Sequence, residues 1–162
     1  MYKIIKKHII IKLHGGLGNQ LFQYSFARAY GLRNDCEVFI DKHTGFYNDS
    51  YKREYLLDQF KININESNSI FFKLYKISFI KKLMKLFCRF IFINEKSNSE
   101  FLSEYLDIQL NGFKIIQGYW QSPLYFNNFK EEIKDDLSIT EKMSEITLAE
   151  SKLINSHSVA LC

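Results

Sequence analysis

Residues 9–41 constrain the fold more than any other part of the chain. Residues 9–13 form a β-branched run of strand length, and a glycine-rich segment at 15–20 ends it at once. Residues 21–32 then place apolar side chains three and four positions apart, which is typical of one helical face: Phe22, Phe26, Ala29 and Leu32. Gly31 and Asn34-Asp35 are expected to end this helix, and residues 37–41 follow as a second strand. Strand, helix and strand joined by a short turn predict a parallel βαβ unit, and hence a Rossmann-like α/β fold with a parallel sheet.

The remaining segments extend the same α/β pattern. At 162 residues the chain is long enough for a single domain with its own core. Asn128 and Glu131 resemble an N-cap with its returning acid, which predicts a helix toward Leu137. The other expected elements are strands at 114–117 and 158–162, a loop at 61–70, a basic helix at 71–93, a linker at 94–100 and a helix at 140–154.

Charge and cysteine content narrow the class of protein. The formal net charge is +4, and only four of the 22 basic residues are arginines, so no arginine-rich stripe predicts nucleic-acid binding. Cys36, Cys88 and Cys162 are odd in number and far apart, which predicts neither a disulfide framework nor a metal site. No stretch reaches the length of a membrane span or resembles a signal peptide. We therefore expect a cytoplasmic protein.

Residues 77–92 carry the chain's local cluster of basic residues. At helical spacing this segment separates an apolar side from a basic side that includes Lys81, Lys82, Lys85 and Arg89. One interpretation is a helix whose apolar side packs on the domain. The other is peripheral attachment to an anionic inner membrane.

Residues 15–20, Gly-Gly-Leu-Gly-Asn-Gln, form the strongest candidate binding feature. Glycines between a strand and a helix let the backbone approach a ligand closely and adopt positive φ. The helix start adds free N–H groups and the positive end of the helix dipole, which favour a phosphate. The simpler interpretation is a tight turn without a ligand.

A dinucleotide-binding loop is the competing interpretation of the same residues. Gly16 and Gly18 begin that fingerprint, and Asp41 ends the second strand where an acid would hold ribose hydroxyls. The third glycine of the fingerprint is replaced by Leu21, which would hold helix and strand apart. A P-loop is excluded because no Gly-Lys-Ser/Thr is present.

Three ordered segments carry a resemblance to a known family. Residues 14–24 (HGGLGNQLFQY), 52–60 (KREYLLDQF) and 118–126 (GYWQSPLYF) resemble signatures of the α-1,2-fucosyltransferases of glycosyltransferase family 11. The resemblance implies an inverting enzyme of GT-B-like architecture. Such an enzyme moves L-fucose from GDP-fucose to the 2-hydroxyl of a galactose in a glycan, without a catalytic metal or a further cofactor.

The resemblance also implies roles for residues of the glycine loop. It places the donor near Gly15, Gly16, Leu17, Gly18, Asn19 and Gln20, with Asn19 close to the sugar–phosphate junction. The alternative for Asn19 is a helix N-cap, a position that Asn fills well. No catalytic residue is assigned.

The family's His-x-Arg-Arg-x-Asp segment, whose arginine contacts the donor diphosphate, does not occur in this sequence. Residues 158–161 resemble the strand that leads into it, and Cys162 stands where its His would be. We therefore expect residues 1–162 to be an N-terminal α/β lobe truncated before the donor-binding lobe, without activity by itself. A nucleotide-binding α/β module of other chemistry and a remnant of a disrupted gene remain alternatives.

Four weaker candidates complete the set. His14 borders the loop and could be catalytic or a simple turn residue. Arg53 and Glu54 are expected to form a structural ion pair. Loop aromatics at 119, 120 and 125 could stack on an acceptor sugar or fill the edge of the sheet. The pair Asp135-Asp136 is expected on a solvated helix surface.

Overall fold

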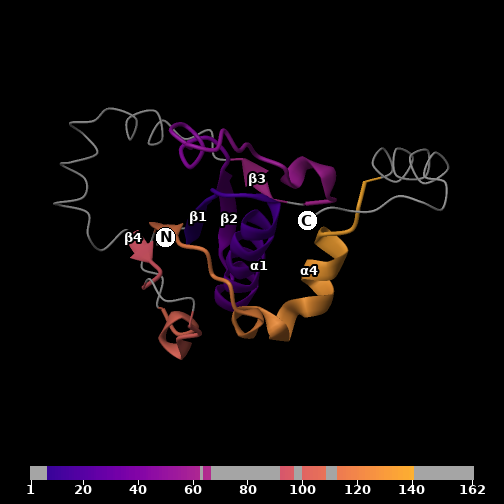
Figure 1. The fold of residues 1–162 in the computed structure, drawn as a ribbon. Coiled ribbons are helices and arrows are strands. Elements are labelled where there is room, and N and C mark those ends of the chain that lie inside the picture. Colours follow the sequence, from indigo (N-terminus) through magenta and orange to yellow (C-terminus); the bar gives the residue numbers. More distant parts are fainter. Residues whose placement is uncertain (1–6, 63, 67–91, 97–99, 109–112, 141–162) are drawn as a thin grey trace, which may run out of the picture.

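The computed structural model describes residues 7–62, 64–66, 92–96, 100–108 and 113–140. Its five strands form one parallel sheet in the order β3-β2-β1-β5-β4 (Figure 1). This confirms the predicted Rossmann-like α/β fold. The strands are β1 (His8–Lys12), β2 (Glu37–Asp41), β3 (Asn65–Glu66), β4 (Phe92–Asn94) and β5 (Phe113–Gln117), and the helices are α1 (Leu17–Asn34) and α4 (Lys130–Asp136). Short 3-10 turns span Leu57–Gln59, Ser103–Tyr105, Pro123–Tyr125 and Asn127–Phe129.

β1 is the central strand. It pairs with β2 on one side, where His8 lies opposite Glu37, and with β5 on the other, where His8 lies opposite Phe113. Ile9, Ile10 and Ile11 are all at most 3% exposed. A continuous apolar run is what a parallel strand covered on both faces requires, so the β-branched run of the sequence becomes the middle of the core.

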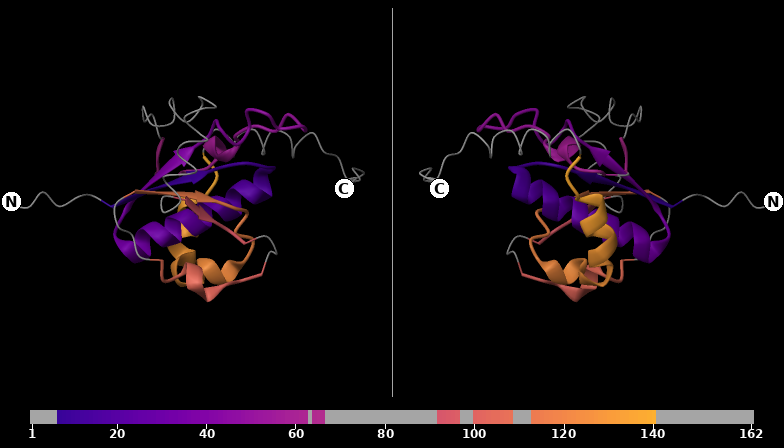
Figure 2. Two further views of the ribbon diagram at one scale, coloured as in Figure 1. Left: turned by 90° about the vertical axis from the view of Figure 1, so that its left-hand side faces the viewer. Right: turned by 90° about the vertical axis from the view of Figure 1, so that its right-hand side faces the viewer.

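α1 is longer than predicted and is buried on more than one side. It begins at Leu17, and Figure 2 shows it lying along one face of the sheet. Within the predicted apolar face Phe26 and Ala29 are buried, whereas Phe22 and Leu32 are only half-buried. The helix also buries Gln20, Gln23, Tyr24 and Tyr30. Segments from several parts of the chain cover these side chains: Gln20 contacts Glu54, Gln23 contacts His14, Tyr24 contacts Asp136 and Tyr30 contacts Ile108.

The predicted stop signal at Asn34-Asp35 is confirmed, whereas the prediction that Gly31 ends the helix is wrong. Gly31 is buried within α1, where it packs closely against Val38 of β2. α1 ends at Asn34, and Asp35 adopts the left-handed conformation with φ 47°. The N–H of Cys36 then donates to the carbonyl of Gly31 at 3.1 Å, which satisfies a carbonyl of the last turn. The chain therefore turns directly into β2.

α4 is joined to α1 through one carboxylate. Asp136 accepts a hydrogen bond from the Tyr24 hydroxyl at 2.8 Å and from Nε of Arg28 at 2.7 Å. Burial, and then Asp136, raise the pKa of Tyr24, so its hydroxyl stays protonated and donates. The prediction that Asp135-Asp136 is solvated surface is thus correct for Asp135, which is exposed, and wrong for Asp136.

The start of α4 differs from the prediction. Asn128 lies inside the 3-10 turn Asn127–Phe129, and the N-cap position of α4 is Phe129, without a side-chain hydrogen bond. The predicted Asn128 cap is therefore wrong. The tighter turn continues directly into α4, so Asn128 never reaches the cap geometry.

Two short strands were not predicted. Residues 92–94 form β4 where the sequence predicted the end of a helix at 71–93, and residues 65–66 form β3 within the predicted 61–70 loop. Strands of two or three residues are too short to show an alternation of apolar side chains. The rest of the helix at 71–93, the 77–91 part of the basic segment, the helix at 140–154 beyond its first residue, and the strand at 158–162 lie outside the described residues. Among the helices that are described, none is long and apolar enough to cross a membrane.

Candidate functional site

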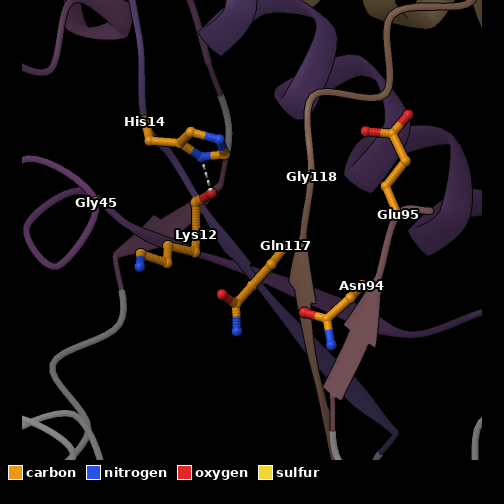
Figure 3. A pocket seen from close by; sticks show the side chains of 7 residues that line it. All are labelled: Lys12, His14, Gly45, Asn94, Glu95, Gln117 and Gly118. Atoms are coloured by element: carbon orange, nitrogen blue, oxygen red, sulfur yellow. Dashed lines mark hydrogen bonds between the residues drawn. The ribbon is translucent and has the colours of Figure 1, made fainter. Parts of the chain in front are cut away.

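The candidate site lies at the carboxyl edge of the sheet. The strand order changes direction between β1 and β5, and open parallel sheets bind ligands at that edge and at such a switch point. A cavity of about 280 Å³ opens there. Figure 3 shows its lining, which includes the last residues of three strands: Lys12 of β1, Asn94 of β4 and Gln117 of β5, together with His14, Gly45, Glu95 and Gly118.

The glycine loop directly follows His14, which lines this cavity, and two of its glycines have open space around their Cα atoms. Gly15 has φ +82°, a conformation that side chains with Cβ rarely adopt, and a Cβ there would lie 2.5 Å from the Asn19 amide nitrogen. At Gly16 and Gly18 an added Cβ would meet nothing within 4 Å among the described residues. The space that these two glycines leave is therefore available to a ligand.

The start of α1 lies in the same loop, and its first backbone N–H groups have no acceptors within the helix. Gly16 is the N-cap residue, in extended conformation, and no described side chain caps the helix there. The first intrahelical bond runs from the Gln20 N–H to the Gly16 carbonyl at 3.1 Å. The N–H groups of Leu17, Gly18 and Asn19 therefore have no acceptor within the helix, and they supply the positive end of its dipole. An anion is the natural partner for such a group of donors.

The buried side chain of Gln20 joins the glycine loop to residues 54–56 through hydrogen bonds. It is fully buried, and its amide nitrogen donates to the carbonyls of Gly15 at 3.0 Å and Glu54 at 2.8 Å. Its amide oxygen accepts from the Leu56 N–H at 2.9 Å. Both ends of the amide are thus occupied, which gives Gln20 a positioning role between the glycine loop and residues 54–56.

Asn19 connects the loop to the segment after β5. It lies in the first turn of α1, so the alternative that made it the N-cap is wrong; Gly16 occupies that position. The Asn19 amide oxygen accepts from Nε2 of Gln121 at 2.7 Å, across 102 residues of sequence. Leu17 is partly buried against the core. Two of the segments that carried the sequence resemblance therefore meet at Asn19 and Gln121.

His14 lies between the cavity and α1. Gln23, which is fully buried, accepts from the His14 N–H at 3.0 Å and donates to its carbonyl at 3.2 Å. The imidazole ring contacts the Tyr119 ring with centroids 4.7 Å apart. Burial lowers the pKa of His14 below its ordinary value, so the neutral imidazole is favoured at pH 7.

Glu95 is a site residue that sequence reasoning missed. Its Oε2 accepts from the backbone N–H groups of Tyr119 at 2.6 Å and Trp120 at 2.9 Å. This carboxylate therefore fixes the start of the segment after β5. No sequence pattern marked Glu95 as a site residue, because it stands in a polar stretch that resembles a linker and the preceding strand is only three residues long.

Arg53 has a different partner from the predicted one. Its guanidinium binds Asp49 with Nε 3.0 Å from both carboxylate oxygens, so the predicted pair with Glu54 is wrong. The Asp49 carboxylate also accepts the N–H groups of Tyr51 and Arg53, which closes a turn. The Arg53 hydrogen bonds lower the pKa of Asp49 to about 2.

Each described arginine has an intramolecular partner. Arg28 binds Asp136, Arg53 binds Asp49, and Nη2 of Arg33 donates to the Tyr125 carbonyl at 3.1 Å. Arg28 and Arg53 are thus paired with carboxylates, while Nη1 of Arg33 is buried without a partner among the described residues.

Asp41 argues against the dinucleotide alternative. It is 4% exposed, and its Oδ1 accepts from the N–H groups of His43 and Thr44, both at 3.0 Å. The hydroxyl of Thr44 donates to the other carboxylate oxygen. An acid that closes its own turn in this way is not presented to ribose hydroxyls.

The loop aromatics divide into two groups. Trp120 and Tyr125 are at most 1% exposed. Trp120 stacks on Phe26 with centroids 3.8 Å apart, and Tyr125 meets the Phe26 ring edge-on at 5.3 Å. These two side chains fill the core, whereas Tyr119 is 44% exposed beside His14 and keeps the possibility of sugar stacking.

In the part of the chain that the structure describes, no group of three or more His, Cys, Asp or Glu side chains has the arrangement of a metal site. Cys36 is half-buried, and burial raises the pKa of its thiol to about 11. A thiol with that pKa is a poor nucleophile at neutral pH.

Comparison with known proteins supports a glycosyltransferase. The chain is 27% identical over 129 residues to an alpha-1,2-colitosyltransferase of Escherichia coli. The match covers 78% of this chain and 43% of that relative, so the chain spans less than half of the relative's length. No family model matches the chain. No solved structure matches it either.

Proposed function

We propose that this chain forms the N-terminal lobe of an inverting α-1,2-fucosyltransferase, which transfers L-fucose from GDP-fucose to the 2-hydroxyl of a galactose in a glycan. The observation that carries the proposal is the glycine loop at the carboxyl edge of the sheet. There the start of α1 has no capping side chain among the described residues, two glycines have open space around their Cα atoms, and His14, directly before the loop, lines a cavity. The similarity to a colitosyltransferase supports the same class of reaction.

In this proposal the loop binds the diphosphate of the donor. The N–H groups of Leu17, Gly18 and Asn19 donate to phosphate oxygens, and the helix dipole adds favourable charge. Gln20 and Gln121 hold the loop and the Asn19 amide in place, so that little ordering is needed when the donor binds. The galactose acceptor lies on the cavity side, where the exposed Tyr119 ring offers a stacking surface.

Binding of GDP, measured by titration calorimetry, tests the role of the loop. We expect the chain to bind GDP, and the substitution Gly18→Val to abolish binding while leaving the melting temperature nearly unchanged, because its side chain projects into ligand space and its Cβ would meet no described residue within 4 Å. Leu32→Val is the matched control, since it places the same β-branched side chain at the other end of α1. Unchanged GDP affinity in Gly18→Val would show that the loop is only a turn.

Transfer assays test the reaction itself. Each described arginine is already engaged, and an oriented cation on a departing phosphate supplies several powers of ten in rate. We therefore expect GDP binding without appreciable turnover when the chain alone meets GDP-fucose and a galactose-terminated acceptor. Turnover comparable to that of a complete transferase would contradict this expectation.

The relative's name favours a second donor sugar. A protein that contains this chain should be offered fucose and colitose donors in parallel, with the same galactose acceptor. Preference for the fucose donor supports the proposal, and preference for the colitose donor would assign the chain the sugar named for its relative.

A further inference from the structure

His14 is held by a buried amide whose orientation is fixed. The amide oxygen of Gln23 accepts from the His14 N–H at 3.0 Å, and its amide nitrogen donates to the His14 carbonyl at 3.2 Å. A backbone N–H only donates and a carbonyl only accepts. The Gln23 amide therefore cannot be turned over without losing both bonds.

This orientation determines where the imidazole carries its proton. Nε2 of Gln23 also lies 3.1 Å from Nδ1 of His14. Because an amide NH₂ group only donates, Nδ1 must accept, and the proton of the neutral ring resides on Nε2. Nδ1 also lies 3.4 Å from the Lys12 carbonyl, the contact drawn in Figure 3, but that distance is longer than a normal hydrogen bond.

The surroundings of His14 favour the neutral ring. Burial is the largest cause of its lowered pKa, and the charges of Lys12 and Arg53 act in the same direction. The nearby Lys12 carbonyl and the Glu95 carboxylate act in the opposite direction. The Tyr119 ring lies against the imidazole, with ring centroids 4.7 Å apart. The balance leaves an uncharged ring with one N–H, on the nitrogen that makes no hydrogen bond to the described residues.

We propose that Gln23 is a positioning residue that presents His14 to the cavity as a neutral hydrogen-bond donor, through Nε2, for a phosphate oxygen of the bound sugar nucleotide. The ligand in this statement rests on the proposed function. The position of His14 supports it, since His14 lines the cavity and directly precedes the glycine loop. A ring that carries its proton on Nε2 cannot accept another there, so His14 is not a general base toward the cavity.

Nitrogen NMR of the histidine rings in the free chain tests the role of Gln23. With ¹⁵N-labelled histidine, and His14→Asn to assign the signals, we expect His14 to show a protonated Nε2 and an unprotonated Nδ1 at pH 7. Its titration midpoint should lie below the ordinary value of 6.5. A proton on Nδ1, or a charged ring at pH 7, would overturn the proposal.

Two variants of Gln23 separate its donor group from its bulk. In Gln23→Glu the carboxylate accepts from Nδ1–H, so the proton should move to Nδ1 and the midpoint should rise. Gln23→Met keeps a similar volume without a donor or a charge, and the preference for Nε2–H should weaken while the midpoint stays below that of Gln23→Glu. Identical His14 spectra for Gln23→Met and the unmodified chain would contradict a positioning role of Gln23. If neither variant folds, the protonation of His14 in the unmodified chain still tests the proposal.

GDP tests the ligand. Addition of GDP should shift the Nε2–H signal of His14, and His14→Phe should weaken GDP binding by about tenfold, the loss expected for one hydrogen bond to a charged group. GDP that binds without moving this signal would overturn the donor role of His14. Failure of GDP to bind at all would count against the proposed function, while the tautomer in the free chain would still decide the role of Gln23.

Discussion

The two segments that follow the central strands β1 and β5 meet at one edge of the sheet, yet they are built in opposite ways. After β1, the glycine loop at 15–20 buries the Gln20 amide, and an added Cβ at Gly16 or Gly18 would meet no described residue within 4 Å. After β5, residues 118–125 turn their largest side chains inward, with Trp120 and Tyr125 in the core.

Because of this difference, we expect substitutions in one segment to affect ligand binding and substitutions in the other to affect the stability of the fold. The segment after β5 places the rings of Trp120 and Tyr125 in the core, so substitutions of these two residues should act mainly on folding. The glycine loop buries a single glutamine amide and keeps space where a ligand fits, so substitutions on its open side should act on binding. Trp120 and Tyr125 suggested sugar stacking in the sequence, but their buried rings contribute to the core instead.

The largest expected effect is at Trp120. Trp120→Ala should destabilise the fold by ~3–5 kcal/mol, because it removes a fully buried ring that stacks on Phe26 and meets Tyr105 edge-on at 4.9 Å. Denaturant unfolding measures the loss. The control is Tyr119→Ala, next in the chain and 44% exposed, which should cost less than ~1 kcal/mol. Equal losses for both residues would remove the distinction between the two aromatics.

Gln20 provides the second test, within the glycine loop itself. Gln20→Leu keeps the volume but leaves the Gly15 and Glu54 carbonyls and the Leu56 N–H without their partner. We expect a loss of ~2–3 kcal/mol in denaturant unfolding. Gln121→Leu, which removes one exposed hydrogen bond, should change stability by no more than ~0.5 kcal/mol. If the two variants unfolded at the same denaturant concentration, Gln20 would not hold the loop.

Substitution by alanine at two glycines of the loop, Gly15 and Gly18, should change the free energy of unfolding in opposite directions. Gly15→Ala forces a Cβ into positive φ and toward Asn19, and should cost ~1–2 kcal/mol. Gly18→Ala adds a Cβ in open space within the first turn of α1, and should raise stability by up to ~1 kcal/mol. Thermal unfolding of both variants measures the difference. A loss in Gly18→Ala as large as that in Gly15→Ala would mean that the space above the loop is not open.

The smallest expected effect is a pH dependence from His14. Its pKa is lower in the folded chain than in the unfolded chain, so the unfolded state binds the proton first as the pH falls. Stability should therefore be constant above about pH 6.5 and decline below it until the folded pKa is reached. Denaturant unfolding at several pH values measures this slope, and His14→Asn should reduce it.

Asp49 affects the stability of the fold in a different range of pH from His14. The pKa of its carboxyl is lowered from 3.8 to about 2, so the stability it adds is present above 3.8 and is lost toward pH 2. The interval between pH 6.5 and 4 therefore isolates His14 from Asp49. An unchanged slope in His14→Asn over that interval would assign the effect to another group.

The spacing of apolar and glycine residues along the sequence predicted the β1–α1–β2 unit, whose elements depend mainly on interactions between neighbouring residues. The run 9–13, the glycine turn and the apolar spacing of 21–32 gave β1, α1 and β2 nearly in place, because a strand, a turn and a helix are each specified by neighbouring residues. The same approach failed for β3 and β4, which are too short to show a period. It also failed for Arg53. The sequence predicted an ion pair with the adjacent Glu54, whereas the structure pairs Arg53 with Asp49, four residues earlier.

The sequence by itself determined that a glycine loop joins a buried strand to a helix, and that this unit belongs to a parallel sheet. Only the tertiary structure decided what surrounds the loop. Gln20 meets residues 34 and 36 positions away, and Asn19 meets Gln121 across 102 positions. Such contacts depend on how the strands are ordered, since β5 must lie beside β1 before its following segment can reach the loop. A hydrogen bond between distant side chains leaves no periodic trace in the sequence, so the order of the strands, and not the motif, assembles the site.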